Sequence, residues 1–357
     1  MRIERVQIEN FRIFADAEWR PKAGINLLVG ENGAGKTSVL EALHIMAFGR
    51  SFRGRIGDGL VRRGSDALQV VIEWQDAAGG HVAGLRHTGS DWQARLDRVA
   101  ISSLAELCEA VRVLTYEPSA QRLVSGPADI RRRFLDWLLF HVEPGFFPEW
   151  RRYTRALRQR NAVLRSGADP NSLLPWEMEM AESGERLHVL REQTCTRLTP
   201  ILTRLLALLA PELGEPRLRF KPGWREGPGG LLAALAEHRV RDASIGYSEI
   251  GTHRFDWRLT LSELDARTML SRGQEKLAGL ACVLAQAIAL NESGRGVPVL
   301  CLDDLPSELD RNHVVHVLDV IQGMGNQVLM SGIEAASWLP DAVHVFHVEH
   351  GSIRPRI

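Results

Sequence analysis

The sequence predicts an α/β fold in which a nucleotide-binding domain is interrupted by a helical insertion. Two apolar runs, Ile25–Val29 and Val299–Leu302, predict strands, the second of a buried type, and each ends at residues suited to phosphate or metal contacts. Between them, residues 129–209 follow the apolar spacing of amphipathic helices. The composition, 45% hydrophobic and 25% charged, is that of a globular protein.

The strongest local motif follows the first of these strands. Gly30, Gly35, Lys36 and Thr37 have the spacing of a phosphate loop, in which backbone N–H groups and a helix N-terminus face phosphate oxygens. The lysine is expected to reach the β- and γ-phosphates and the threonine to bind Mg²⁺. A chance glycine turn is the alternative, but the apolar residues that follow recur at helical spacing, which gives the required strand, loop and helix. The residues predicted to bind nucleotide here are Gly30, Glu31, Asn32, Gly33, Ala34, Gly35, Lys36, Thr37 and Ser38.

Charge and composition narrow the class of protein. The formal net charge is zero, so any affinity for nucleic acid has to come from local basic patches. The four cysteines are far apart and form no CxxC pair, which favours neither a zinc site nor a disulfide framework and fits a reducing compartment. The N-terminus lacks the apolar core of a signal peptide, and no apolar run approaches the roughly 20 residues of a spanning helix. We therefore expect a cytoplasmic protein without a membrane partner.

Residues 1–125 are expected to hold the phosphate loop and a β layer. A first strand is predicted within residues 3–14, and further strands that form a small β layer are expected at 68–74, 82–86, 92–96 and 111–116. Five arginines and one acid occupy residues 50–63, and among them Arg53 and Arg55 are candidate contacts to nucleotide or DNA phosphates. A solvated loop explains the same cluster, and the sequence does not decide between the two.

Residues 126–245 are expected to form the helical insertion, a short arm. Between residues 131 and 165 the chain has nine arginines and three acids. One interpretation is a helix with a basic face that follows a DNA backbone, with Arg131, Arg132 and Arg133 as contacts. The other is an ordinary amphipathic helix pair whose arginines are solvated. The sequence supports these two interpretations about equally.

Residues 246–357 are expected to complete the nucleotide domain. Alternating apolar residues at 255–261 indicate a strand, and a strongly apolar helix is predicted at 277–290. After the apolar run that ends at Leu302, the pattern predicts further elements of an α/β half. These are a helix at 311–321 and strands at 327–330 and 343–348.

Asp303 and Asp304 directly follow the second apolar strand. A carboxylate at the C-terminal end of such a strand can hold the Mg²⁺ that bridges β- and γ-phosphates, and a second one can polarise the attacking water. We assign the metal to Asp303 together with Thr37, and the base to Asp304, so that both acids and Lys36 form the predicted catalytic set. Two acids at a strand end often only cap a turn, but a phosphate loop requires such a partner. Because Lys36 and Asp303 are far apart in the sequence, the nucleotide domain is predicted to be split around the insertion.

Ser271, Arg272, Gly273 and Gln274 precede the strongly apolar helix. A serine and a glycine at a helix start suit an N-cap in a tight turn, and they equally present a hydroxyl, N–H groups and a positive dipole end to an anion. The Ser-x-Gly-Gln core is similar to the signature motif of ABC-type ATPases, whose serine binds the γ-phosphate held by the opposite subunit. The phosphate loop and the Asp303 strand occur in the matching order, so the signature interpretation is favoured.

The chain resembles the RecF family of bacterial recombination mediators along essentially its whole length. The most specific segments of this resemblance are the Arg-Arg-Arg-Phe-Leu-Asp run at 131–136 and the Ser-Arg-Gly-Gln run at 271–274. All matching stretches together are 8–12 (Ile-Glu-Asn-Phe-Arg), 30–37, 49–53 (Gly-Arg-Ser-Phe-Arg), 126–137, 270–276 and 302–310.

This resemblance implies an ABC/SMC-like ATPase head with a short helical arm, which binds ATP and Mg²⁺. It also implies weak, DNA-stimulated ATP hydrolysis, an ATP-dependent homodimer on double-stranded or gapped DNA, and work with RecR and RecO. The implied role is to load RecA at single-strand gaps in recombinational repair, replication and the SOS response. Ser271 becomes the signature contact, with Arg272, Gly273 and Gln274 in the same loop. Asp310 becomes an acid at the dimer interface, and Asn32 lies near the γ-phosphate. Ser331 takes the place of the switch histidine of many such ATPases, so slow turnover is expected.

Other classes of protein share some of these motifs. Another ABC/SMC-headed repair ATPase, or one associated with a nuclease, has the same head, although a nuclease needs a further acidic metal cluster. A transporter-type ATPase is disfavoured by the basic arm and by the lack of a coupling segment. The phosphate loop alone also fits a small-molecule kinase, against which the signature loop argues.

Overall fold

The computed structural model describes residues 1–54, 59–167, 169–335, 339 and 342–356, which form two compact units. The first unit comprises residues 1–121 and 276–357, and the second comprises residues 122–275. The second unit thus extends past the boundary expected at residue 245, because strand β10 (Asp256–Leu261) pairs with β9 (Pro216–Lys221) inside it. Over the described residues, no helix is long and apolar enough to cross a bilayer.

A six-stranded sheet forms the centre of the first unit, in the order β15-β14-β3-β13-β12-β8. Strands β14, β3, β13, β12 and β8 are parallel to their neighbours, and β15 is antiparallel to β14. Every residue of β3, β12 and β13 is buried, as expected for a parallel sheet covered on both faces. The strand bounds are β3 Ile25–Val29, β8 Val113–Tyr116, β12 Val299–Leu302, β13 Val328–Ser331, β14 His344–Glu349 and β15 Ser352–Pro355.

The placement of β8 corrects one prediction. The segment 111–116 was expected in the antiparallel layer, but β8 pairs in parallel with β12. Its residues Val113, Leu114 and Tyr116 are buried, which fits the inside of a parallel sheet. The helices outside the second unit are α1 Lys36–Phe48, α2 Leu104–Ala110, α10 Leu305–Glu308 and α11 Arg311–Met324, together with all but the first turn of α9 Arg272–Glu292.

A second, antiparallel sheet in the first unit has the order β2-β1-β4-β5-β6-β7. Its strands alternate, so that Leu68, Val70 and Ile72 of β4 are buried in the core that they share with α1, whereas the residues between them are partly exposed. Strand β7 and helix α2 lie between predicted strands and were not expected. The strand bounds are β1 Arg2–Phe11, β2 Phe14–Trp19, β4 Leu68–Asp76, β5 Gly79–His87, β6 Trp92–Leu96 and β7 Val99–Ile101.

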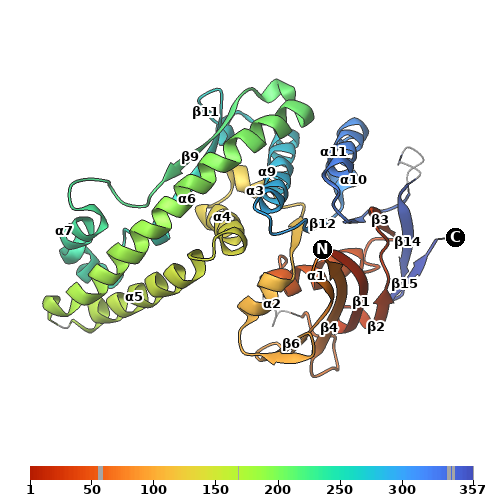
Figure 1. Ribbon diagram of the computed structural model, residues 1–357, viewed down its shortest axis with the longest axis horizontal. Helices are drawn as coiled ribbons and strands as arrows, with labels where there is room; N and C mark the ends of the chain where they lie inside the picture. The colour runs from red at the N-terminus through yellow and green to blue at the C-terminus, as the bar shows by residue number, and fades with distance from the viewer. Residues whose placement is uncertain (55–58, 168, 336–338, 340–341, 357) are drawn as a thin grey trace. The chain divides into compact units, whose positions relative to one another are not determined.

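The second unit is built on a long helical hairpin. Helices α5 (Phe146–Ser166) and α6 (Leu174–Leu209) run side by side, as Figure 1 shows. Pro200 lies inside α6, where it removes one backbone hydrogen bond without ending the helix. The remaining helices are α3 Arg122–Ser125, α4 Ala128–Val142, α7 Gly230–Ile245 and α8 Ala266–Met269, with short 3-10 turns at Pro170–Leu173, Pro211–Leu213 and Thr252–Arg254. The strand β11 (Leu264–Asp265) completes a three-stranded sheet with β10 and β9.

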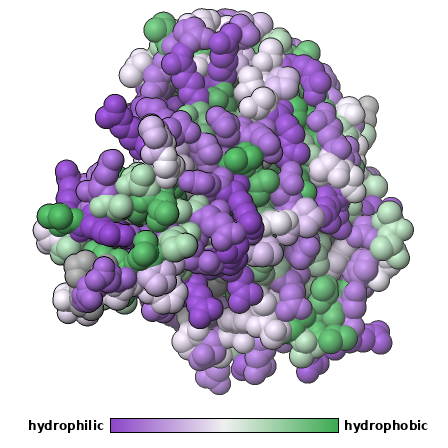
Figure 2. Space-filling model, turned by 60° about the vertical axis from the view of Figure 1, so that its left-hand side comes forward, coloured by the Kyte–Doolittle hydropathy of each residue, from purple (hydrophilic) through white to green (hydrophobic). Residues whose placement is uncertain are grey.

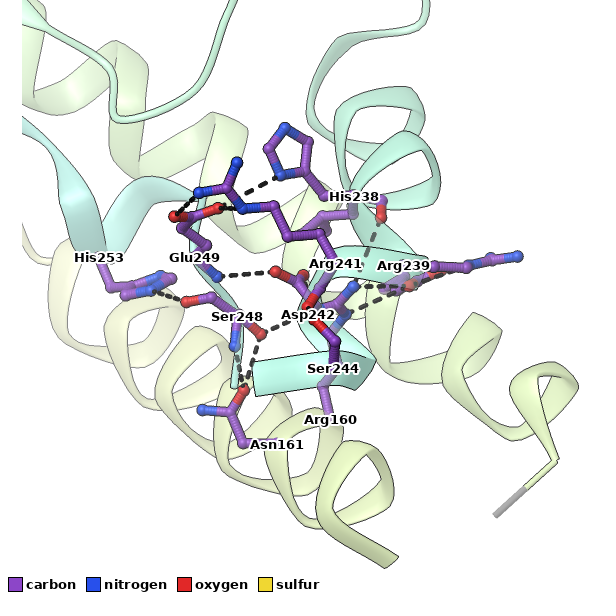
Figure 3. Close-up of polar contacts among 12 residues, drawn as sticks. Arg160, Asn161, His238, Arg239, Arg241, Asp242, Ser244, Ser248, Glu249 and His253 are labelled. Carbon is purple, nitrogen blue, oxygen red and sulfur yellow. Dashed lines mark hydrogen bonds and ion pairs between the residues drawn. The ribbon is translucent and has the colours of Figure 1, made fainter. Parts of the chain in front are cut away.

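A buried ionic cluster ties α7 to this hairpin. Arg160 of α5 has no exposed side-chain surface, and its guanidinium donates to Glu177 of α6, to Asp242 of α7 and to Ser248. Glu177 also accepts from Arg239 of α7. Figure 3 shows Arg160, Asp242 and Ser248 of this cluster. Each buried charge therefore has an opposite charge and hydrogen bonds, which is the condition for burying ions in a protein core.

The surface of the described chain is mainly polar. Figure 2 shows a face on which hydrophilic side chains predominate and hydrophobic ones occur in small groups. The most exposed large hydrophobic residues, such as Val99 and Val240, are far apart in the sequence. Scattered exposed hydrophobic residues of this kind are normal for a folded domain and indicate no particular function.

Candidate nucleotide site

The loop between β3 and α1 has a backbone that only glycine can follow at two points. Gly30 has φ 153°, and a Cβ atom there would lie 2.3 Å from the carbonyl oxygen of Val348. Gly35 has φ 110°, and its Cβ atom would lie 2.7 Å from the ring of Phe14. The loop therefore passes close to its neighbours and turns into α1 immediately after Gly35, as the spacing predicted.

Lys36 folds back over this loop. Its Nζ donates to the carbonyl oxygens of Gly30 (2.7 Å) and Glu31 (2.9 Å), and only 9% of the residue is exposed. Burial lowers the pKa of the Lys36 ammonium, and the negative charges of Asp304 and Asp303 oppose this shift. Within the part of the chain that the structure describes, the hydrogen bonds of Lys36 Nζ go mainly to neutral carbonyl groups, which are weaker partners than a phosphate.

Asp303 receives two hydroxyl hydrogen bonds on one oxygen. Thr37 Oγ1 donates to Asp303 Oδ1 over 2.9 Å, and Ser331 Oγ donates to the same atom over 2.7 Å. The three residues meet because β3, β13 and β12 are neighbouring parallel strands, whose C-terminal ends share one edge of the sheet. Burial raises the pKa of the Asp303 carboxyl group, while both hydroxyl groups lower it.

Ser331 therefore does more than the sequence suggested. Its hydroxyl group donates to Asp303 and accepts from the backbone N–H of Asp304, over 2.8 Å. One buried side chain thus fixes both members of the acidic pair. Asp304 has φ 54°, a left-handed conformation that is unusual for a residue other than glycine, and its Oδ1 accepts from Ser307 Oγ over 2.7 Å. The hydrogen bonds that hold the pair thus come from neutral hydroxyl groups.

These side chains surround a hollow of about 420 Å³. Its predicted members are Asn32, Gly33, Gly35, Lys36, Thr37, Ser38, Asp303 and Asp304. Gly30, Glu31 and Ala34 belong to the same loop but do not line the hollow. Four further residues line the hollow although the sequence analysis did not assign them to the nucleotide site: Arg12, Ile13, Pro118 and Ser331. Arg53, a candidate contact to nucleotide or DNA phosphates, also lines it.

Glu41 organises the two arginines at this hollow. Its carboxylate is completely buried in α1 and accepts from Arg12 Nε (3.0 Å) and Nη2 (2.8 Å) and from the hydroxyl group of Ser51. Ser51 Oγ in turn accepts from the backbone N–H of Arg53 over 2.9 Å. Of this network, the sequence motifs included only Arg12, at the end of the Asn-Phe-Arg run. No sequence pattern indicated Glu41.

The predicted signature loop lies at the exposed start of α9. The backbone N–H of Ser271 donates to Gln274 Oε1 (3.1 Å), and the backbone N–H of Gln274 donates to Ser271 Oγ (3.4 Å). This reciprocal pair is a capping box, so Ser271 caps the helix. Ser271, Arg272 and Gly273 are exposed, which leaves the loop accessible. Asp310 caps α11 with its side chain, which accepts from the backbone N–H groups of Asn312 and His313.

The arginines proposed to contact DNA occupy different environments. Arg131 is only 5% exposed and donates to both carboxylate oxygens of Asp256, over 2.7 and 3.0 Å, so its placement does not fit the expectation of a DNA contact. Arg132 donates to the carbonyl oxygen of Phe255, and Arg133 pairs with Asp129 on the surface. Arg55 lies outside the described residues. Arg131 and Arg132 therefore already use donors within the fold, whereas Arg133 pairs with a surface acid, and DNA contacts of this run stay a prediction.

The fold and this hollow define the class of protein. A phosphate loop, an acidic pair at the end of a neighbouring strand and a helical unit inserted between them make a P-loop nucleotide-binding head of the split type. The sequence model of the family described as "RecF/RecN/SMC N terminal domain" matches residues 2–351. The chain belongs to the RecF family of DNA replication and repair proteins, as the following comparisons establish.

The relatives show the family, and the solved structures share the fold. The DNA replication and repair protein RecF of Stenotrophomonas maltophilia (strain R551-3) is 47% identical over 99% of both chains. RecF of Xanthomonas oryzae pv. oryzae (strain MAFF 311018) is 48% identical, over 99% of this chain and 100% of its own. A structure of the recombination mediator protein RecF-ATPrS in the RecFOR pathway has a TM-score of 0.89 and 21% identity over 99% and 98% of the two chains. A crystal structure of an SmcHead, bound to the C-winged helix domain of ScpA, has a TM-score of 0.61 and 14% identity over 100% and 97%. The predicted family and the SMC-like α/β head are therefore confirmed.

Proposed function

We propose that this chain is an ATP-switched clamp on DNA that acts in recombinational repair. The observation that supports it most directly is the convergence of Thr37 and Ser331 on one oxygen of Asp303, beside a lysine that donates to the carbonyl groups of Gly30 and Glu31. Such a site has oxygen ligands for a metal and a cation for phosphate, already held in position. Solved structures of RecF-ATP and RecF-ATPrS share this fold, which supports ATP as the nucleotide.

The residues present fit Mg²⁺. Thr37 Oγ1 and the Asp303 carboxylate are oxygen donors 2.9 Å apart, and Mg²⁺ prefers a few such ligands together with phosphate oxygens. When bound, the ion neutralises charge between the β- and γ-phosphates. On nucleotide binding, Lys36 Nζ exchanges its carbonyl partners for phosphate oxygens. Asp304 orients and deprotonates the attacking water, and hydrolysis is slow because a serine, Ser331, takes the place of a switch histidine.

ATP also controls assembly in this proposal. Ser271, Arg272, Gly273 and Gln274 of one subunit complete the site that holds ATP on the other, and Asp310 lies at the same interface. ATP therefore favours a closed dimer on double-stranded or gapped DNA, and hydrolysis releases it. RecR and RecO are the proposed protein partners, consistent with the RecFOR pathway named for the similar structures, and RecA loading at gaps is the proposed outcome.

Light scattering tests this proposal directly. The molecular mass is measured without nucleotide, with ADP, with ATP, and with ATP and a gapped duplex. A doubling of mass with ATP only, strengthened by DNA, is expected. A mass that does not respond to nucleotide would contradict the shared-site mechanism.

A substitution in the signature loop separates binding from assembly. Ser271→Arg is expected to leave ATP binding by the monomer within about twofold, while a bulky cation prevents the second subunit from closing. Ser244→Arg, on the exposed face of α7, is a matched control that should dimerise normally. If Ser271→Arg instead lost ATP affinity as a monomer, the loop would not be the contribution of a second subunit.

A further inference from the structure

The outer face of the antiparallel sheet in the first unit has a basic hollow. In the register of β4, β5 and β6, Gln69 lies opposite Arg86, Arg86 opposite Gln93, and Gly84 opposite Arg95. These residues alternate with the buried ones and therefore share the outward face. Gly84 lacks a side chain, so the centre of the face is depressed between the two arginines.

This hollow measures about 870 Å³. Its polar lining consists of Arg86, Arg95 and Arg98 together with Gln69, Gln93 and Ser102. Aspartate and glutamate are absent from the described residues that line it. The chain has equal numbers of basic and acidic side chains, so an acid-free lining with three arginines is a local departure from the average.

The three arginines have no protein partner within the described chain. All three are exposed, and neither ion pairs nor hydrogen bonds of their side chains occur among the described residues. The nearest acid in sequence, Asp97, is already engaged, because it accepts from His81 Nδ1 (2.8 Å) and from the backbone N–H of Val82 (2.9 Å). The guanidinium groups therefore keep their donors for a ligand, unlike Arg131, whose donors are used inside the fold.

The turn that presents Arg98 is strained. Leu96 pairs with Val99, so Asp97 and Arg98 form a two-residue turn, in which they have φ 48° and φ 69°. Turns of this type favour asparagine or aspartate followed by glycine, and a long side chain at the second position costs stability. Strain of this kind is typically retained where a side chain has a function. Asp97 anchors the turn, and Arg98 reaches the hollow from it.

We propose that this face binds the sugar-phosphate backbone of duplex DNA. Arg86 and Arg95 lie diagonally on neighbouring strands, with Cβ atoms roughly 7–8 Å apart, which lets them bind different phosphates of one backbone. Gln69 and Gln93 donate further hydrogen bonds to phosphate or sugar oxygens. A single strand is the poorer occupant because the only aromatic residue that lines the described hollow, Trp92, is packed against the core and offers no stacking surface.

This inference rests on the proposed function, since it assigns a surface to the DNA partner. It predicts contacts without base specificity, because arginine and glutamine bind backbone oxygens that every sequence shares. It also predicts that the contact is independent of the nucleotide pocket, whose lining residues are different.

The salt dependence of DNA binding tests it. Arg86, Arg95 and Arg98 are changed together to glutamine, and the affinity for a random duplex is measured in ATP between about 50 and 200 mM salt. Each lost phosphate contact lowers the slope of log K against log salt by about 0.9, so a fall of about three is expected, with at least a tenfold loss of affinity. Arg20, Arg354 and Arg356, changed together to glutamine, remove the same charge elsewhere in the first unit and should leave the slope nearly unchanged.

The outcomes separate the two proposals. An unchanged slope in the triple variant, with normal duplex binding by the wild-type chain, would overturn the assigned surface and leave the clamp intact. Wild-type protein that binds no duplex in ATP would overturn both. Equal losses of DNA affinity in the triple variant and its control would mean that net charge alone causes the effect. A loss confined to single strands or to an acidic protein partner would also contradict the proposal.

Arg98→Gly is a second variant that controls for misfolding. It relieves the strained turn and should therefore raise the melting temperature while it weakens DNA binding.

Discussion

Two buried charge clusters, one in each unit, are balanced in opposite ways. In the arm, Arg160 and Arg239 meet Glu177 and Asp242, so every charge has an opposite charge in contact. In the nucleotide hollow, Lys36 donates to carbonyl groups, and Asp303 accepts from hydroxyl groups. The first cluster is complete within the fold, whereas the second keeps positive and negative charge available for a ligand that has both metal and phosphate. In the function we propose, the buried charge of Arg160 is therefore structural and that of Lys36 and Asp303 serves the ligand.

Removing Arg160 should have the largest effect on stability. Arg160→Met leaves the buried charge of Asp242 unpaired and removes one of the two arginine partners of Glu177, so we expect the free energy of unfolding of the arm to fall by about 3–5 kcal/mol. ATP affinity should stay within about twofold. Denaturant unfolding followed by circular dichroism measures the first quantity and nucleotide titration the second. Arg158→Met, on the exposed side of the same helix, is the control and should change stability by less than about 0.5 kcal/mol. Equal stability of the two variants would show that the ionic cluster does not stabilise the arm.

Removing Lys36 should have the converse result. Lys36→Met loses the cation that meets the phosphates, and we expect ATP affinity to fall at least about 100-fold, or roughly 2.7 kcal/mol. The unfolding free energy should hardly change, because the ammonium is bound only by carbonyl groups and its burial is unfavourable. Lys22→Met removes an exposed lysine of the same unit and is the matched control. A large loss of stability in Lys36→Met would show that this lysine has a structural role, like Arg160.

Glu41 combines features of both clusters. It pairs with Arg12, as the arm acids pair with arginines, yet Arg12 lines the nucleotide hollow. Glu41→Gln should cost about 1–3 kcal/mol of stability, because a buried hydrogen-bonded charge is lost. It should also lower ATP affinity several-fold, since Arg12 and Arg53 lose their common anchor. Glu18→Gln, which weakens an exposed pair with Arg5, should do neither. If Glu41→Gln destabilised the protein without any effect on nucleotide, the residue would be purely structural.

The contrast between the clusters also explains what the sequence could predict. Lys36, Thr37 and Asp303 follow short buried strands, and such local patterns are readable because the strand ends of a parallel sheet meet at one edge. The ion-pair partners of Arg131 and Arg160 could not be predicted from the sequence. Asp256 lies 125 positions from Arg131, and Asp242 lies 82 positions from Arg160, so an arginine-rich helix gave no sign of which side chains were buried. The sheet membership of β8 was missed for the same reason, because a run of four residues does not specify its partner strand.

Replacing Ser331 should have the smallest effect of these substitutions. It tests most directly how hydrogen bonds set the pKa of Asp303. Its hydroxyl group stabilises the charged form of Asp303, so Ser331→Ala should raise the pKa of that carboxyl group further above its ordinary value. Metal binding needs the ionised carboxylate, and the acid limb of Mg²⁺-dependent ATP binding should therefore move to higher pH. A hydrogen bond worth about 0.5–1.5 kcal/mol corresponds to a shift of at most about one pH unit. Ser307→Ala removes a hydrogen bond from Asp304 instead and should leave this limb in place, while Ser331→Thr should restore it. An acid limb that is identical in Ser331→Ala and wild type would mean that Thr37 alone holds Asp303 in its charged form.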